Sequence, residues 1–218
     1  MPFSMTSYDT RLEFSFDIIK NTCVGNVEDF IITLPEYRYI AKWLCRPEIH
    51  VLKFVDPQFS NILFEGSFNM SPLKSGDDII GIRCRYVTNR PFGIQEAVMY
   101  AYDFEQSDDQ LVIHDISDEA GFIYPHVEIT CKENGNLYLT NSYDNRDTII
   151  YNCSENERII MTDHLIIASD NPDHLIQNDF NYEYIRIANN YYNFTNAITS
   201  SLKCHIEISY NPIAKVVY

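Results

Sequence analysis

The second half of this chain is a series of short, strand-like segments separated by Asp, Asn, Ser, Gly and Pro. Runs of five to eight residues, rich in Ile, Val and Tyr, recur at short intervals from Ala97 onwards. Segments of this length and spacing are typical of an antiparallel β-sandwich, a fold that more often presents surfaces than performs chemistry. The predicted strands are Ala97–Phe104, Leu111–Ile116, His126–Cys131, Asn136–Thr140, Thr148–Asn152, Arg158–Thr162, Leu165–Ser169, Tyr184–Ala188 and Lys203–Tyr210.

The first ninety residues predict a smaller α+β unit. Arg11–Ile18 alternates apolar and polar residues, as a half-buried strand does. Leu34–Leu44 has the apolar stripe of an amphipathic helix, with Pro35 in its first turn and a stop before Arg46-Pro47. We expect a small sandwich flanked by this helix. Further strands are predicted at Glu48–Val55, Asn61–Phe68 and Ile79–Val87, with a hairpin turn at Asp56-Pro57 and a polar loop over Ser71–Asp78.

Two turns are predicted in the second half. Asn134-Gly135 lies between alternating runs and favours a tight hairpin, because both residues tolerate positive φ. Asp163-His164 is predicted to form a second tight turn, between Arg158–Thr162 and Leu165–Ser169. The apolar residues expected on the buried face of the first hairpin are Val127, Ile129 and Cys131 in one strand and Leu137 and Leu139 in its partner.

Charge divides the chain near Asn89–Gly93. Residues 1–90 carry eleven Asp and Glu against ten Lys and Arg, whereas residues 91–218 carry twenty against six. This change predicts two domains, 1–90 and 91–218, and a single domain with an acidic face is the alternative. The net charge of −15 repels phosphate backbones and anionic membrane surfaces. We therefore expect no sequence-specific nucleic-acid binding and no membrane partner.

Several features predict a protein made and used in a reducing cytosol. No apolar stretch approaches the ~20 residues that a membrane helix needs, and residues 1–10 lack the character of a signal peptide. The cysteines are scattered without a C-x-x-C pair, so we interpret them as structural thiols. They are Cys23, Cys45, Cys84, Cys131, Cys153 and Cys204.

Two clusters of titratable residues are the candidates for chemistry. The first fits no metal-ligand spacing, and a polar hairpin end followed by a loop explains it more simply. The second resembles the paired carboxylates of glycosidases, but an exposed loop offers nothing to raise one pKa above the other. We interpret it as a solvated acidic loop or a weak cation site. We expect no catalytic residue, no metal and no cofactor. The clusters are Asp163, His164, Asp170, Asp173 and His174, and Asp103, Glu105, Asp108 and Asp109.

A carbohydrate-binding module is the alternative function. Sugar-binding sandwiches stack a pyranose ring on an aromatic side chain, and Trp serves best. The single tryptophan, Trp43, falls in the predicted helix and not in the sandwich, although Tyr191 or Tyr192 could substitute.

The order of the segments resembles one known family, the distal tail (Dit) proteins of bacteriophages with long, non-contractile tails. The likeness runs from about Arg11 to the end of the chain, and it lies in the order and spacing of motifs that are individually common. These motifs are the helix Leu34–Leu44 around Trp43, Glu48–Phe59, Ile62–Phe68, Ile80–Tyr86, Asn89–Phe92, Ala120–Ile129, Asn134–Asn141, Asn156–Met161, Asn178–Phe180 and Ile206–Tyr210.

This resemblance implies a non-enzymatic structural protein of the virion tail, assembled in the host cytoplasm. It implies that residues 1–90 resemble tail-tube subunits and close into a homo-oligomeric ring of six copies, and that residues 91–218 form a galectin-like sandwich. The ring would join the tail tube to the tail tip, its receptor-binding proteins and the baseplate. Family members usually have a further segment before the strand matched by Arg11–Ile18. We therefore expect either an abbreviated front domain or a truncated chain. The family has no catalytic residues to transfer, and the ring contacts stay unassigned.

Overall fold

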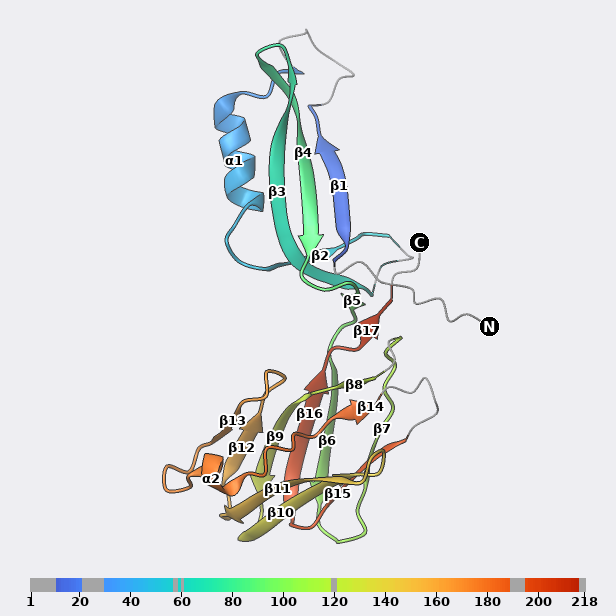
Figure 1. The fold of residues 1–218 in the computed structure, drawn as a ribbon, viewed down its shortest axis with the longest axis vertical. Coiled ribbons are helices and arrows are strands. Elements are labelled where there is room, and N and C mark those ends of the chain that lie inside the picture. Colours follow the sequence, from blue (N-terminus) through green and yellow to red (C-terminus); the bar gives the residue numbers. More distant parts are fainter. Residues whose placement is uncertain are drawn as a thin grey trace, which may run out of the picture. The chain divides into compact units, whose positions relative to one another are not determined.

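The structure is a computed structural model that describes residues 11–20, 30–56, 59, 61–118, 121–188 and 195–215. It consists of two compact units, one with the residues up to Ile94 and one running from Gln95 to Lys215. Each unit is described by itself below. Strands dominate both units, and two helices accompany them in the described residues (Figure 1). The expectation of a mainly β fold is confirmed.

The first unit is built on a twisted antiparallel sheet. Its strands follow the order β1-β4-β3-β5, and β2 pairs with β3. Alternation in β1 places Phe14 among aromatic rings, with centroids 5.1 Å from Phe54 and 4.9 Å from Phe64. The described residues form one sheet here, so the expectation of a small sandwich is wrong. The strands are β1 Glu13–Ile18, β2 His50–Lys53, β3 Leu63–Ser75, β4 Asp78–Thr88 and β5 Gly93–Ile94.

Helix α1, Leu34–Leu44, has the predicted bounds because its start and its buried face are both encoded locally. Thr33 caps the helix, and Glu36 returns the contact by accepting a hydrogen bond from the Thr33 amide at 2.8 Å. Lys20 Nζ lies 2.9 Å from the same carboxylate. These contacts lower the pKa of Glu36 to about 2, the Thr33 amide contributing most. The helix covers one face of the sheet around Ile32, Leu44, Ile82 and Cys84.

The polar segment Ser71–Asp78 is not a loop, which corrects the sequence prediction. β3 continues to Ser75, pairs with β4 along its length and turns at Gly76 and Asp77. Gly76 has a φ of 62°, the first-position geometry of a two-residue hairpin turn. The strand is polar because one sheet face is exposed, so composition alone resembles a loop. β2 and β3 also pair as predicted, although Pro57 lies outside the described residues.

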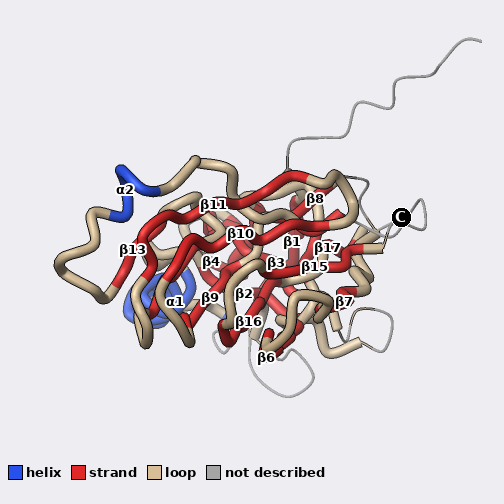
Figure 2. Tube along the Cα trace, turned by 90° about the horizontal axis from the view of Figure 1, so that it is seen from below, coloured by secondary structure: helices blue, strands red, loops and turns tan. Residues whose placement is uncertain are grey.

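The second unit is an antiparallel β-sandwich. One sheet has the order β11-β10-β15-β7 and the other has the order β13-β12-β9-β16-β6, while β14 pairs with β8. The strands of the two sheets cross in Figure 1, and Figure 2 shows β11, β10 and β15 over β9, β16 and β6. The elements are β6 Val98–Phe104, β7 Leu111–Ile113, β8 Phe122–Ile123, β9 His126–Cys131, β10 Gly135–Asn141, β11 Arg146–Cys153, β12 Arg158–Met161, β13 Ile167–Ser169, α2 Ile176–Asp179, β14 Ile187–Ala188, β15 Asn196–Ser200, β16 Cys204–Tyr210 and β17 Ile213–Ala214.

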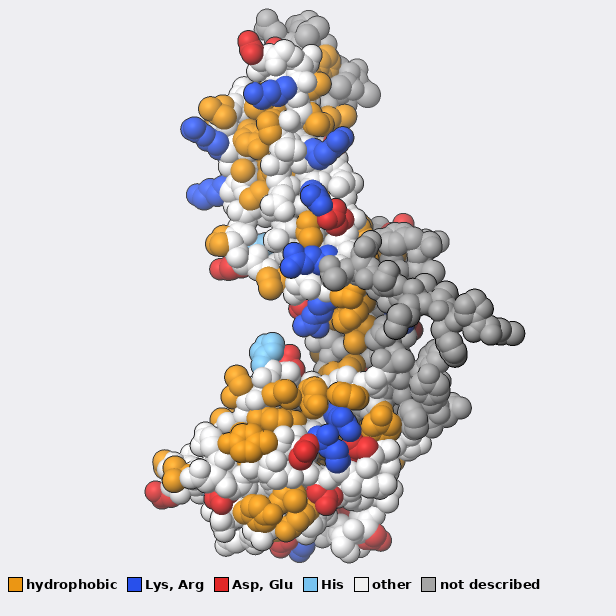
Figure 3. Space-filling model, in the orientation of Figure 1, with side chains coloured by type: hydrophobic (Ala, Val, Ile, Leu, Met, Phe, Trp, Pro, Cys, Tyr) orange, Lys and Arg blue, Asp and Glu red, His pale blue; other side chains and the backbone are white. Residues whose placement is uncertain are grey.

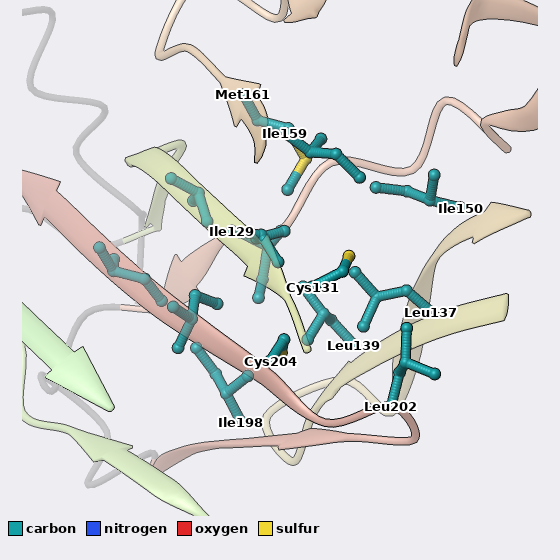
Figure 4. Packing of buried hydrophobic residues seen from close by; sticks show 14 of the residues in the cluster. Ile129, Cys131, Leu137, Leu139, Ile150, Ile159, Met161, Ile198, Leu202 and Cys204 are labelled. Atoms are coloured by element: carbon teal, nitrogen blue, oxygen red, sulfur yellow. The ribbon is translucent and has the colours of Figure 1, made fainter. Parts of the chain in front are cut away.

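The core of this unit lies between the two sheets. Figure 4 shows residues from β9, β12 and β16 facing residues from β10, β11 and β15. The alternating strands supply one fully buried side chain at every second position, as in β9 and β10. Members of this cluster include Ile129, Cys131, Leu137, Leu139, Ile150, Ile159, Met161, Ile198 and Cys204.

The predicted Asn134-Gly135 hairpin is wrong. The flanking strands β9 and β10 belong to different sheets, so Asn134-Gly135 connects the two layers. The loop is held by its surroundings, because Asn134 Oδ1 accepts from the Glu155 amide at 2.7 Å. The predicted buried faces are nevertheless right, since these residues meet across the core. Alternation determines which face is buried but not which strand is the neighbour.

The second predicted turn is confirmed, and one central strand was not predicted. β12 and β13 pair antiparallel around Asp163-His164, and Leu165 closes the turn with a φ of 58°. β15 joins β10 to β7, but its sequence Asn-Ala-Ile-Thr-Ser has few apolar residues. Asn196 is fully buried there and accepts from the Ala188 amide at 2.8 Å while donating to the Ala188 carbonyl. A satisfied buried amide thus replaces an apolar residue.

Candidate functional site

The outer face of helix α1 is the strongest candidate for a functional surface in the first unit. Tyr37, Ile40 and Leu44 turn towards the sheet, so residues one position away turn outwards. Tyr39 is 77% exposed and Trp43 is 63% exposed, one helical turn apart. Isolated exposed apolar residues are ordinary, but two large aromatic rings on one helix face resemble the anchors of protein interfaces.

An apolar groove continues this face. It has a volume of about 490 Å³ and lies where α1 meets the end of β1. The Lys20–Glu36 ion pair is its only charged lining among the described residues. Ile19 is 61% exposed beside it. The other lining residues are Ile18, Ile32, Pro35, Tyr39 and Ile40.

Three cations accompany these rings. Arg38 and Lys42 are exposed on α1, and Arg46 follows the helix. None of the three has a carboxylate partner among the described residues. Figure 3 shows Lys and Arg side chains beside hydrophobic ones over this part of the first unit. The helix therefore combines exposed aromatic area with positive charge that has no carboxylate partner in the described part of the chain.

The opposite face of the first sheet is polar and internally paired. Arg83 donates to both carboxylate oxygens of Asp17 at 2.9 Å, and Arg85 pairs in the same way with Glu13. The guanidinium of Arg83 lowers the pKa of Asp17. These exposed pairs neutralise their own charges, so this face carries little net attraction for a charged partner.

The candidate metal cluster is not assembled. Asp163 and His164 lie exposed at the β12–β13 turn, whereas His174 is buried and contacts other residues. Among the described residues, no group of three or more His, Cys, Asp and Glu side chains has the arrangement of a metal site. The interpretation as a hairpin end and a loop therefore describes Asp163 and His164, but not His174.

His174 belongs to a buried polar network around Glu157. His174 Nδ1 lies 2.5 Å from Glu157 Oε1, Ser169 Oγ donates to that same oxygen, and the Ser154 amide donates to Oε2 at 2.8 Å. Burial by itself raises the pKa of Glu157, but these hydrogen bonds outweigh it and lower the pKa. The sequence gives no signal for this network, because its members are brought together only by the fold.

Carboxylates of the second candidate cluster are engaged in ion pairs and hydrogen bonds with neighbouring groups. Lys132 Nζ lies 2.7 Å from Asp103 Oδ1 and also pairs with Glu105. Lys132 and His205 lower the pKa of Asp103. Asp109 accepts from the Glu105 and Gln106 amides, which lower its pKa. No carboxyl in this loop has a raised pKa among those that shift, so the arrangement lacks the separated acid and base of a glycosidase.

A second buried carboxyl, Asp115, was missed by the sequence reasoning. Ser117 Oγ donates to Asp115 Oδ1 at 2.9 Å. Asp115 Oδ2 and the Tyr210 hydroxyl are both buried, and neither has a partner with hydrogen-bond geometry in the described part of the chain. Burial raises the pKa of Asp115. Asp115 is only 2% exposed, so we interpret it as structural.

The cysteines of the second unit are core residues. Cys131, Cys153 and Cys204 are buried, and Cys131 lies directly opposite Cys204 in the β9–β16 ladder. Burial raises the pKa of the Cys204 thiol to about 11. Such thiols are poor nucleophiles. Cys45 is exposed, and Cys23 lies outside the described residues.

The exposed aromatic rings described in the second unit include Phe122, Tyr151 and Tyr182. Phe122 is 45% exposed, but the Arg186 guanidinium lies 4.4 Å from its ring centroid and covers that face. Arg186 is fixed in turn by Asp144 at 2.8 Å. Tyr191 and Tyr192, the residues proposed to replace Trp, lie outside the described residues. Trp43 is on α1, as predicted.

The described residues form apolar cores, paired surface charges and one exposed aromatic helix face, which is typical of a structural component. None of the described helices is long and apolar enough to cross a membrane. A family model described as "Phage tail C-terminal domain" matches residues 92–210, more than half of the chain, and one described as "Phage tail protein N-terminal domain" matches residues 2–90. The chain belongs to this family of phage tail proteins, and its role is structural.

A solved structure is similar over both units. The crystal structure of Dit (gp 19.1) of phage SPP1, titled a paradigm of the hub adsorption apparatus in phages that infect Gram-positive bacteria, aligns with a TM-score of 0.61. The alignment covers 91% of this chain and 78% of that chain, at 11% sequence identity. At this identity the likeness shows the fold. A search of the curated proteins gives no match.

Proposed function

We propose that this protein is a distal tail protein of a phage or prophage with a long, non-contractile tail. In this proposal six copies close into a ring that joins the tail tube to the tail tip and its receptor-binding proteins, and the protein has no catalytic activity. The observation that carries it is the order of two phage-tail modules within one chain, with both units aligned to SPP1 Dit.

The two units take different roles in this proposal. Residues 1–90 form the ring, and residues 91–218 project from it as a galectin-like sandwich. The difference in charge supports this division, because the first ninety residues are nearly neutral and copies of them repel little. Limited proteolysis near Asn89–Gly93 should leave a stable fragment close to 91–218 with β-type circular dichroism. A helical fragment would contradict the division.

The test of the proposed function is the assembly state of the full chain. Sedimentation over a wide concentration range should give a closed oligomer of defined mass, and negative-stain electron microscopy should give rings with a central opening. A chain that stays monomeric at every concentration would overturn the proposal. Binding of a defined glycan with a Kd near 1 μM, about −8 kcal/mol, would favour the carbohydrate-binding alternative.

A further inference from the structure

The described part of the first unit carries two exposed charge sets of opposite sign. Arg38, Lys42 and Arg46 line the exposed aromatic face of α1, where Tyr39 and Trp43 are 77% and 63% exposed. Asp77 and Asp78 lie exposed at the turn between β3 and β4. Neither set has an ion-pair partner among the described residues. Within the described residues of one copy, both sets therefore lack a counter-charge.

The turn between β3 and β4 is the tip of a long hairpin, and such a tip can insert into a surface of a partner. The hairpin pairs from Gly66 to Ser75 on one strand and from Asp78 to Thr88 on the other, and its turn lies at one end of the first unit (Figure 1). Ile80 is 44% exposed next to the two carboxylates. Lys74 is also exposed there, so the tip carries a net charge of −1 from these three residues.

The exposed face of α1 and the groove beside it have the features of a docking surface for a protein partner. Its groove of about 490 Å³ is mostly apolar and is bordered by Tyr39. Trp, Tyr and Arg are the residue types that contribute most at the centres of protein interfaces. Exposed cations beside them steer an acidic partner and set its orientation.

We propose that the aromatic–basic face of α1 docks the Asp77–Asp78 hairpin tip of a second copy of this chain. The contact joins different surfaces on the two copies, so it repeats head to tail and generates a ring where the rotation closes. This inference rests on the proposed ring and adds which surfaces hold it. Charge complementarity identifies the occupant, because the same unit supplies both the cations and the carboxylates.

Charge reversal with rescue tests this contact in the full chain. One variant carries Arg38→Glu with Lys42→Glu, a second carries Asp77→Lys with Asp78→Lys, and a third combines all four substitutions. Sedimentation equilibrium gives the Kd for association of each. Each double variant should raise the Kd at least about tenfold, and the four-fold variant should return to within about threefold of the unmodified chain.

Two further variants complete the test. Trp43→Ser should raise the Kd about 30-fold, the equivalent of about 2 kcal/mol, because it removes an interface anchor. Asp108→Lys with Glu155→Lys makes the same charge change as the hairpin variant, but on exposed residues of the second unit, and should leave the Kd unchanged apart from the common effect of net charge. Circular dichroism and melting temperature establish that each variant is folded.

The outcomes separate this inference from the proposed function. If the unmodified chain forms rings and the α1 and hairpin variants form them equally well, this contact is wrong and the ring stands. If both double variants weaken association and the combination does not rescue it, the pairing of these two surfaces is wrong. If the unmodified chain is monomeric at every concentration, both proposals are wrong.

Discussion

Glu157 Oε1 lies 2.5 Å from His174 Nδ1 inside the second unit, and this contact holds the segment before α2 against β12. Ser169 donates to the same carboxylate oxygen, so one acceptor satisfies two side chains. A buried carboxylate with several donors is costly to alter, because each donor left without its partner keeps its desolvation cost. The network therefore fixes a polar position inside an otherwise apolar sandwich.

Glu157→Gln should lower the free energy of unfolding by about 2–4 kcal/mol, because the amide nitrogen presents hydrogens to at least one existing donor. Urea denaturation of the full chain at neutral pH measures this. Glu155→Gln, two residues away on an exposed turn, is the matched control and should change stability by less than about 0.5 kcal/mol. Equal effects of the two substitutions would contradict a special role for Glu157.

The same network predicts a loss of stability in acid. The pKa of Glu157 is lower in the folded chain than its ordinary value of 4.5, so its contribution is present above pH 4.5. That contribution disappears as the pH falls through the lower, folded value. The difference in melting temperature between Glu157→Gln and the unmodified chain should therefore shrink below pH 4.5. A difference independent of pH would show that the carboxylate does not act through its charge.

For Asp115 we expect the opposite dependence of folding stability on pH. Its pKa is raised above 3.8 by burial, so the folded unit is more stable with Asp115 protonated and loses that advantage as the pH rises through the folded pKa. Asp115→Asn removes the buried charge while keeping an acceptor for Ser117. It should raise stability at pH 7 by about 1–2 kcal/mol, with no gain near pH 3. Melting temperatures between these pH values measure the effect, and a loss of stability at pH 7 would refute it.

Any side chain at Gly66 should cause a severe packing defect in the first unit. A Cβ on Gly66 would lie 2.3 Å from the Val87 carbonyl oxygen and 2.9 Å from Thr88 Cα, and backbone cannot move aside cheaply. Gly66→Ala should lower the stability of this unit by about 3 kcal/mol or more. Ser67→Ala, at the next and exposed position of β3, is the control. Hydrogen exchange should show lost protection in β2, β3 and β4, with the second unit unaffected.

The difference in burial among the cysteines leads us to expect that the exposed thiol is chemically modified before the buried ones. In a Cys23→Ser background, iodoacetamide should label the exposed Cys45 in the folded chain. Cys84, Cys131, Cys153 and Cys204 should react only after unfolding, because they are buried and the reagent cannot reach their sulfur atoms. Peptide mapping by mass spectrometry with and without guanidinium distinguishes the sites. Labelling of Cys204 at the rate of Cys45 would contradict the packing of β16.

Local signals account for what the sequence predicts well. Helix α1 is predicted to its terminal residues, because Pro35 in its first turn, the apolar stripe along it and Pro47 just beyond its end are all local signals. β9 has the predicted bounds, because its alternation places every second residue in the core. The turn at Asp163-His164 is likewise encoded in adjacent residues.

Non-local relationships account for what the sequence does not predict. Asn134-Gly135 has hairpin composition, yet the strands beside it pair with β12, β16, β11 and β15 instead. β15 is polar because Asn196 and Ser200 find hydrogen-bond partners inside the fold. The exposure of Tyr39 and Trp43 depends on which side of α1 meets the sheet. The helix stripe indicates that side, but the groove beside it requires Ile18 and Ile19 from a distant segment.

The position of β16 between β9 and β6 has a consequence for the order of folding. Tyr102 of β6 pairs with Ile206, so a strand that leaves the ribosome early waits for one made about a hundred residues later. The entropy cost of closing that loop is met before the strands gain any stability from pairing, so contacts of this kind form slowly. Until Cys204–Tyr210 has been synthesised, the apolar edge of β6 has no neighbour in its sheet. The second unit therefore cannot complete this sheet before its last long strand has been made, and that strand sets the earliest moment at which a subunit is ready for assembly.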